Sequence, residues 1–318
     1  MKPLTIEALL QTKGQTLALE PLNGCGLQRP IQDPTISSPG LVLAGFTDRF
    51  PKGRIQVFGE TEIRFLYSLD AKAQRQSLET FFSLDMPAVV VTKGQKVPPV
   101  MIEVAEEHAV PVLRSKLKTG DFYRRLQPYL EEQFAPTTTM HGSLADVYGV
   151  GLLFVGRSGI GKSECVLDLV ERGHRLVADD LVYVSKRGND VLLGRGHELQ
   201  QHHMEIRGIG IIDVKALFGI RAARHQKRIE VVVQLEDWQE QGKYDRTGLD
   251  SHETDVLGVK LPKVVVPLNA GKNITVLSEV VAMNHLLKYS GVHSADLFNK
   301  RLQAAMQPLR DYLEEDYE

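Results

Sequence analysis

Residues 156–163 read Gly-Arg-Ser-Gly-Ile-Gly-Lys-Ser, the G-x-x-x-x-G-K-S/T pattern of a phosphate-binding loop. An apolar run ends at Val155 and a helix is predicted to begin at Lys162, so the pattern stands between a strand and a helix, as the motif requires. Glycines let successive backbone N–H groups turn toward a triphosphate, and the helix N-terminus adds a partial positive charge. The predicted nucleotide-binding residues are Gly156, Arg157, Ser158, Gly159, Ile160, Gly161, Lys162 and Ser163.

The last two residues of the loop have the most specific predicted roles. In this pattern the Lys162 ammonium reaches the β- and γ-phosphates, and the Ser163 hydroxyl binds Mg²⁺. The motif therefore predicts binding of ATP with Mg²⁺, and it leaves the reaction open.

Two adjacent carboxylates, Asp179 and Asp180, lie between short predicted strands over residues 175–178 and 181–184. Paired carboxylates at a strand junction of a P-loop domain usually face the metal and the nucleophile, and a solvated turn is the alternative. Neighbouring residues of an extended segment point to opposite sides, so the two should have different tasks. Either residue can fill either role at this level.

Three further polar residues are candidates for the same site. Glu205 opens an apolar run interrupted by Gly208 and Gly210, which looks like a buried strand or turn. Glycines in such a run indicate close approach of the backbone to a ligand, and a bulge beside a surface glutamate is the alternative. His141 and Arg246 are the other candidates, although residues of either type are, singly, more often structural than catalytic.

The surrounding elements predict an α/β fold with two domains. In the first 130 residues, strand-like runs at 41–44, 55–58, 88–91 and 111–113 alternate with helical patterns, which is typical of a small α/β domain with parallel strands. We place the boundary near residue 135, after an amphipathic helix. Residues 1–135 then form an N-terminal α/β domain of unassigned role, and residues 136–318 form a P-loop domain that ends in a C-terminal helix.

Composition limits the classes of partner. The chain carries 38 basic and 40 acidic residues, a net charge of −2, which gives no electrostatic basis for nucleic acid or an anionic membrane as the main partner. No run approaches the ~20 apolar residues of a membrane span. Two cysteines, Cys25 and Cys165, and a start that lacks signal-peptide features predict a cytoplasmic protein with unpaired thiols.

Several motifs together resemble those of the HPr kinase/phosphorylase family. The most specific are residues 156–164, the Arg-Gly-His-Arg-Leu-Val-Ala-Asp-Asp run at 172–180 and the Met-Glu-Ile-Arg-Gly-Ile-Gly-Ile-Ile-Asp-Val run at 204–214. Additional matches are His141-Gly142, Asp146 to Gly149, Tyr244 to Arg246 with Gly248, and Glu279 to Asn284, and the N-terminal half is more weakly similar, chiefly at Arg54 to Glu62. The resemblance implies a kinase that uses ATP or pyrophosphate, with Mg²⁺, to phosphorylate a seryl hydroxyl of the phosphocarrier protein HPr. It also implies a phosphorolysis that releases pyrophosphate.

The resemblance assigns roles residue by residue. Asp180 would be the acid/base, Lys162 would hold phosphate, and Ser163 and Glu205 would bind Mg²⁺. His141 and Arg246 would be further catalytic residues. Members of the family form homohexamers in which the C-terminal helix lies at a neighbour's active site, and an apolar stripe over residues 298–313 suits that arrangement or packing on its own domain.

One loop departs from the family pattern, and two rival functions remain. At residues 267–272, Asn269 and Lys272 stand where the family commonly has a basic residue and arginine, which predicts weaker phosphorylase activity. A P-loop small-molecule kinase or a phosphoenolpyruvate carboxykinase-like enzyme is one rival, disfavoured by the Glu-Ile-Arg-Gly run. A nucleotide-gated regulator without protein kinase activity is the other, and the intact Asp180 disfavours it.

Overall fold

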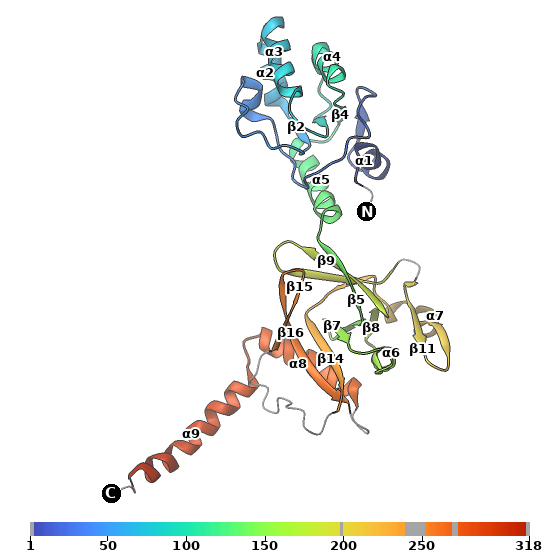
Figure 1. The fold of residues 1–318 in the computed structure, drawn as a ribbon, viewed down its shortest axis with the longest axis vertical. Helices are drawn as coiled ribbons and strands as arrows, with labels where there is room; N and C mark the ends of the chain where they lie inside the picture. Colours follow the sequence, from blue (N-terminus) through green and yellow to red (C-terminus); the bar gives the residue numbers. More distant parts are fainter. Residues whose placement is uncertain (1–2, 198–199, 239–251, 269–272, 316–318) are drawn as a thin grey trace. The chain divides into compact units, whose positions relative to one another are not determined.

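The computed structural model describes residues 3–197, 200–238, 252–268 and 273–315, with side chains up to residue 306 (Figure 1). The chain divides into two compact units, Met1–Ala135 and Pro136–Glu318. Each unit is described separately below.

The first unit is built on a four-stranded sheet with the order β1-β4-β3-β2. Strands β2, β3 and β4 are parallel, as the alternating pattern predicts, and β1 is antiparallel to β4. The strands are β1 (Leu19–Pro21), β2 (Gln56–Phe58), β3 (Val89–Val91) and β4 (Val112–Ser115).

Five α-helices cover this sheet: α1 (Ile6–Lys13), α2 (Glu60–Ser68), α3 (Ala71–Phe82), α4 (Pro99–Glu107) and α5 (Thr119–Gln133). One cluster of buried side chains joins α2, α3 and α4 to the sheet, and a second joins α1 and α5 to it. Apolar residues at helical spacing, such as Phe122, Leu126 and Leu130 of α5, are fully buried, which explains why these segments are helical.

The strand expected at residues 41–44 is wrong, because this segment is the 3₁₀ helix η1 (Gly40–Ala44). Pro39 precedes the helix in an αR conformation, and Gly45 ends it with φ 93°. Val42 and Leu43 are buried and Leu41 is exposed, so the three apolar residues serve a tight turn and not a strand. Proline and glycine at its ends outweigh the β propensity of the run.

The second unit contains a six-stranded sheet with the order β15-β16-β14-β7-β6-β8. Its strands are β6 (Ser143–Val147), β7 (Val150–Val155), β8 (Arg175–Ala178), β14 (Val231–Asp237), β15 (His252–Val256) and β16 (Val259–Leu268). Strands β7, β14 and β16 are parallel, whereas β6 is antiparallel to both β7 and β8. It follows that β8 runs in the same direction as β7.

A second sheet and a hairpin complete the strands of this unit. The second sheet has the order β13-β10-β9-β5 and comprises β5 (Thr137–His141), β9 (Leu181–Arg187), β10 (Val191–Arg195) and β13 (Gln226–Arg228). One apolar cluster joins the two sheets through residues such as Leu144, Leu153 and Val182. The hairpin pairs β11 (His203–Ile206) with β12 (Gly210–Asp213).

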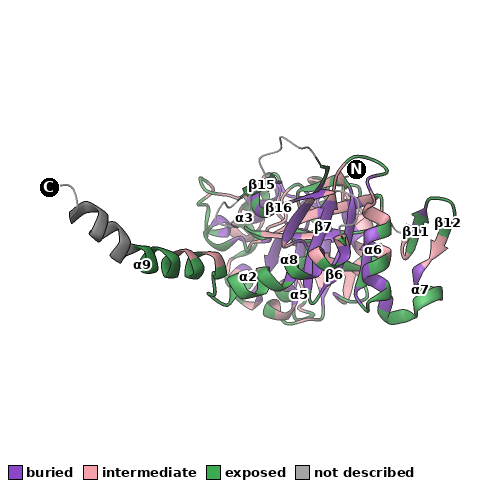
Figure 2. Ribbon diagram, turned by 90° about the horizontal axis from the view of Figure 1, so that it is seen from below, coloured by how far each residue is buried: buried purple, intermediate pink, exposed green. Residues whose placement is uncertain are grey.

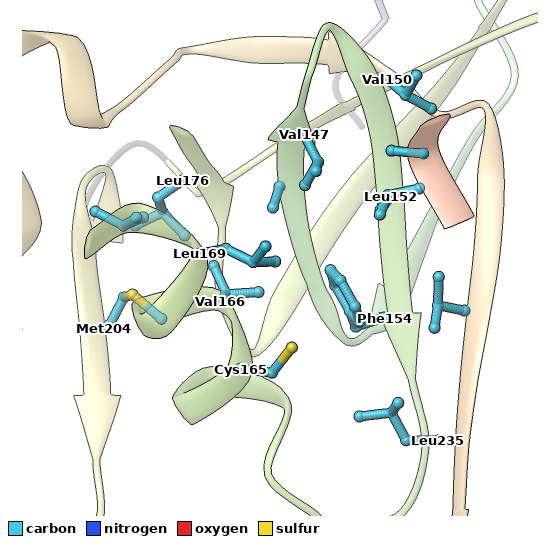
Figure 3. Packing of buried hydrophobic residues seen from close by; sticks show 14 of the residues in the cluster. Val147, Val150, Leu152, Phe154, Cys165, Val166, Leu169, Leu176, Met204 and Leu235 are labelled. Carbon is cyan, nitrogen blue, oxygen red and sulfur yellow. The ribbon is translucent and has the colours of Figure 1, made fainter. Parts of the chain in front are cut away.

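Helices of the second unit are α6 (Lys162–Glu171), α7 (Val214–Phe218), α8 (Ile274–Tyr289) and α9 (Ser294–Glu315), with the short η3 (Ile220–Ala222) after α7. Helix α6 packs on β6 and β8, and its Cys165, Val166 and Leu169 point into the same core cluster as Leu152 and Phe154 of β7 (Figure 3). Fully burying side chains of this size is worth about 1.5–3 kcal/mol each. This packing fixes the helix that carries the phosphate loop.

The C-terminal helix α9 is present, as the sequence predicts, and it contains the apolar stripe that starts at Phe298. Its described apolar side chains Phe298, Leu302 and Met306 are exposed, as Figure 2 shows by the green along the helix. Packing of the stripe on its own domain is therefore not seen for these residues. Among the described helices, none combines the length and the apolar character needed to cross a membrane.

Candidate active site

The six-stranded sheet brings the predicted catalytic segments to one edge. Strands β7 and β14 end there at Val155 and Asp237. Because β8 runs in the same direction as β7, it also ends at this edge, at Ala178, and Asp179 follows directly. Strand β6 runs the opposite way and therefore begins there, at Ser143. In open α/β sheets, ligands bind at the carboxyl ends of the parallel strands.

The phosphate loop follows β7 and leads directly into α6, as predicted. Gly161 occupies the N-cap position of α6 with φ 103°, in the left-handed region that glycine enters without strain. At Gly159, φ is 74°, and a Cβ atom would lie 2.7 Å from the Arg207 guanidinium nitrogens. Ile160 is buried in the core and anchors the loop. These glycines therefore allow both the turn and the close approach of a cation.

Lys162 stands at the first position of α6 with its ammonium group over the loop. Its Nζ donates to the carbonyl oxygens of Gly156 at 3.2 Å and Arg157 at 3.1 Å. Among the described residues no carboxylate pairs with it, so its charge is available to an anion. The Arg157 side chain is engaged differently, in a bidentate pair with Asp237 at 2.6 and 2.8 Å.

Asp179 is the carboxylate that faces the phosphate loop. Its Oδ1 accepts from the Ser163 hydroxyl at 3.0 Å and from the buried Ser143 hydroxyl at 2.5 Å. Burial raises the pKa of Asp179, and the hydrogen bonds from the two hydroxyls, together with the nearby backbone N–H groups of Asp180 and Glu205, offset part of that rise. The structure therefore links Asp179 to the predicted Mg²⁺-binding serine.

Asp180 has a different environment from its neighbour. It is exposed, and its side chain makes no hydrogen bond or ion pair among the described residues. Its backbone has φ 64°, which is uncommon for a residue other than glycine, and its carbonyl accepts from Gly142 at 3.0 Å. The β5–β9 pairing sets His141 opposite Leu181, beside Asp180. Strain of this kind is frequent where a side chain is held for function.

Glu205 lies on the β11–β12 hairpin, against α6. Met204 and Ile206 on either side of it are buried in the core with α6, whereas Glu205 is exposed and its backbone N–H lies near the Asp179 carboxylate. The expectation that this apolar run is buried is wrong in part, because Ile209 and Ile211 are 73% and 76% exposed. The glycines serve the hairpin turn, with φ 82° at Gly208 and 97° at Gly210.

The structure thus brings His141, Lys162, Ser163, Asp180 and Glu205 to one edge of the unit. Arg246 and the loop residues Asn269 and Lys272 lie outside the described residues. Sequence reasoning missed Ser143 and Arg207: the first binds Asp179, and the second lies against Gly159. Arg207 belongs to the Glu-Ile-Arg-Gly run identified from the sequence, so it could have been predicted as a phosphate-binding cation from that motif.

The residues at this edge fit Mg²⁺ together with a phosphate ligand. Within the described part of the chain, no three His, Cys, Asp or Glu side chains are grouped as a metal site of their own. Mg²⁺ usually keeps several waters and binds one or two carboxylates plus substrate phosphates. The Ser163 hydroxyl and the Asp179 carboxylate, which are hydrogen-bonded to each other, supply that kind of donor set, and the Glu205 backbone lies next to the same carboxylate.

Comparison with protein families matches both halves of the chain. A model described as HPr Serine kinase N terminus matches residues 4–130, and one described as HPr Serine kinase C-terminal domain matches residues 132–302. The chain belongs to the HPr kinase/phosphorylase family. It is therefore an enzyme of the kinase/phosphorylase class.

Curated relatives agree over most of the chain. The HPr kinase/phosphorylase of Chloroherpeton thalassium is 46% identical over 301 residues, which cover 92% of this chain and 88% of that protein. The protein of the same name from Geobacillus kaustophilus is 44% identical, covering 91% and 93%. A solved structure of the HPr(Ser) kinase/phosphatase from Coxiella burnetii is 34% identical, with a TM-score of 0.46, over 51% of this chain and 98% of that one.

Proposed function

We propose that this protein phosphorylates a seryl residue of an HPr-type phosphocarrier protein, with ATP or pyrophosphate as donor and Mg²⁺ as cofactor. We propose that it also catalyses phosphorolysis of the phosphoserine to give pyrophosphate. The observation that carries this proposal is the division of labour in the acidic pair. Asp179 is bound to Ser163 of the phosphate loop, whereas the Asp180 side chain is exposed and has no partner among the described residues.

In the kinase direction, the seryl oxygen attacks the terminal phosphorus of the donor, and the bond from that phosphorus to its bridging oxygen breaks. The Asp180 carboxylate accepts the seryl proton, and the leaving group takes the electrons of the broken bond: ADP when ATP is the donor, and inorganic phosphate when pyrophosphate is the donor. The Lys162 ammonium and the α6 N-terminus hold the phosphates. Mg²⁺, held by Ser163, Asp179 and Glu205, would neutralise phosphate charge during the transfer.

Phosphorolysis uses the same groups in the opposite sense. An oxygen of inorganic phosphate attacks the phosphoserine phosphorus, the bond from phosphorus to the seryl oxygen breaks, and protonated Asp180 returns its proton to that oxygen. The products are pyrophosphate and the unmodified serine. His141, beside Asp180 in the β5–β9 ladder, and Arg246 are proposed as further residues of the site. With Asn269 and Lys272 in the loop after β16, we propose that this direction is the weaker one.

We further propose that the chain acts as a homohexamer in the cytoplasm. The exposed Phe298, Leu302 and Met306 of α9 support a helix that packs on another subunit. The free thiols of Cys25 and Cys165 support a reducing compartment. The particle mass from light scattering tests the assembly against the 35.5 kDa chain.

The activity is tested with a purified HPr-type carrier, ATP and Mg²⁺, followed by mass spectrometry to locate the phosphate. The matched control is the same carrier with the modified serine replaced by alanine. We expect phosphate on the serine of the unmodified carrier. We also expect release of pyrophosphate when inorganic phosphate is added to the phosphorylated carrier. Nucleotide binding without phosphate on the carrier would overturn the proposal in favour of a nucleotide-gated regulator.

A further inference from the structure

Parts of three motifs that have no role in the proposed reaction meet at the far end of α6. They are Asp146 to Gly149, the Arg172-to-Arg175 part of the second motif, and Glu279. Tyr148, Arg172 and His174 line a cavity of about 350 Å³ there, together with Asp146, Gly149, Gly173, Arg175 and Arg224. Its volume lies at the lower end of the range for small-molecule sites.

Guanidinium groups outnumber carboxylates around this cavity. Arg172 pairs with Glu279 through Nε at 2.9 Å and Nη2 at 2.6 Å, and Arg224 pairs with Asp146 through Nη1 at 2.7 Å. Each arginine has five N–H donors, so both keep unused donors after these contacts. The side chain of Arg175 is exposed and makes no hydrogen bond or ion pair among the described residues. One full positive charge is therefore without a counter-charge at this place.

The carboxylates hold the arginines in position. Glu279 is buried, and its carboxylate also accepts a hydrogen bond from His174 Nε2 at 3.0 Å, while the Tyr148 ring packs edge-on against His174. The Arg224 backbone N–H donates to the Leu176 carbonyl of β8, which ties this residue to the strand that begins at Arg175. Preorganised guanidinium forks lose little entropy when they bind an anion.

Asp146 adds one more observation that points to a ligand or ordered solvent. The residue is 5% exposed, and its Oδ1 has no hydrogen-bond partner among the described residues, although Oδ2 binds Arg224. Buried polar atoms are nearly always satisfied, so an orphan oxygen beside a cavity indicates a missing donor. A hydroxyl of a bound molecule or a protonated phosphate oxygen can supply it.

This cavity is distinct from the phosphate loop. Helix α6 has ten residues between Lys162 and Glu171, so the two sites lie about 15 Å apart along its axis. The partial negative charge at the helix C-terminus opposes an anion, and Arg172 at the C-cap position offsets it. The strands agree with this separation, because β8 begins at Arg175 near the cavity and ends beside Asp179.

We infer that this cavity is a second anion site, which binds a phosphate group through Arg175, Arg172 and Arg224. Planar guanidinium groups match phosphate oxygens in pairs, which is why arginines clustered in a pocket favour this ligand over a simple halide. The phosphate is either inorganic or part of a small hydroxyl-bearing monoester. The site occupies the end of α6 and β8 opposite to the catalytic groups.

The test uses the full chain with Lys162→Ala, which weakens phosphate binding at the phosphate loop. Titration calorimetry measures binding of inorganic phosphate in one arm and of glycerol 3-phosphate in the other. Adding Arg175→Gln should weaken binding about 10- to 100-fold, as expected for loss of a charge-assisted contact. Arg175→Lys should give an intermediate loss, because charge remains without the fork. The matched control is Arg221→Gln, an exposed arginine of the same unit that does not line the cavity.

The outcomes separate the alternatives. Tighter binding of glycerol 3-phosphate than of inorganic phosphate identifies the monoester as the ligand class, and the reverse order identifies free phosphate. Arg224→Lys keeps a cation beside Asp146 and should also weaken binding, which guards against misfolding of a single variant. Saturable binding that Arg175→Gln and Arg221→Gln leave equally unchanged would place the anion elsewhere and overturn the inference. Absence of binding in the Lys162→Ala chain would overturn it as well.

Discussion

The two ends of helix α6 use charge in opposite ways. At its N-terminal end, Lys162 donates only to loop carbonyls, and the nearby Asp180 side chain has no partner among the described residues. At its C-terminal end, Glu279 is held by Arg172 and His174 and is 6% exposed. One helix therefore carries unpaired charge where phosphate chemistry is expected and paired charge where α6 meets α8.

This difference separates function from stability. A buried carboxylate needs its partners, so removing one side of the Glu279 network should destabilise the fold. Groups without partners cost little to remove from the folded state, but they are the groups that a ligand can engage. Variants at the first end should therefore change activity, whereas variants in the Glu279 network at the second end should change the stability of the second unit.

The largest effect is expected for Lys162→Ala. The variant lacks the ammonium group that stabilises the triphosphate in both the bound state and the transition state. We therefore expect kcat/KM for carrier phosphorylation to fall at least about 10³-fold and the affinity for ATP to fall with it. The melting temperature should stay unchanged. Steady-state kinetics and ATP titration measure these quantities, and unchanged nucleotide affinity and rate would refute the assignment of the phosphate loop.

Asp180→Asn should reduce phosphoryl transfer by about 10²- to 10⁴-fold, because the amide cannot take the seryl proton. Binding of the Mg²⁺–nucleotide complex should persist, since Asp179 makes the contact to Ser163. Glu205→Gln is the contrasting variant, for which we expect a higher Mg²⁺ requirement with a rate that recovers at high Mg²⁺. A near-parental rate for Asp180→Asn would mean that the base is another residue.

Glu279→Gln tests the opposite end of α6 through stability. Hydrogen bonds from Arg172 lower the pKa of Glu279 from 4.5 to about 2. A hydrogen bond from His174 and the charges of both residues contribute to this shift. A depressed folded-state pKa contributes stability above 4.5 that is lost as the pH falls toward 2. The variant should therefore melt at a lower temperature than the parent at pH 7, by a margin that shrinks at pH 4.

The activity of the folded Glu279→Gln protein at a temperature well below its melting point should equal that of the parent. Thermal melts at the two pH values, beside initial rates, are the measurements. A margin that does not depend on pH would show that packing, and not the charge of Glu279, explains any destabilisation.

The smallest effect is expected for the stability of Asp179→Asn. Burial raises the pKa of Asp179 above 3.8. Ionisation of this carboxyl therefore lowers the stability of the folded state as the pH rises from 3.8 through the raised value. Asparagine keeps an acceptor for Ser143 and Ser163 without that cost. We expect a slightly higher melting temperature at pH 7 without divalent cations, together with reduced Mg²⁺-dependent activity. A lower melting temperature at pH 7 would show that the charge itself stabilises the junction.

Much of the site could be predicted from the sequence because its core is local. The loop at 156–163 needs only the order strand, glycines, helix, and the structure has β7, left-handed glycines and α6 in that order. The parallel strands β2, β3 and β4 and the alternation of helices with them follow from the spacing of apolar residues in the same way. The spacing did not predict α1, α2 or β1, and it predicted a strand where Pro39 and Gly45 turn the chain into η1.

Tertiary structure decided how distant residues combine. The sequence defined the pair Asp179-Asp180 without assigning its roles, and only the β6–β8 pairing brought Ser143 to Asp179, 36 residues away. In the same way the sequence contained Arg172 and Glu279 as separate motifs, which become one ion pair across 107 residues. Spacing along the chain fixes backbone donors within a single turn, whereas contacts between remote side chains depend on strand register and on which helix face is buried.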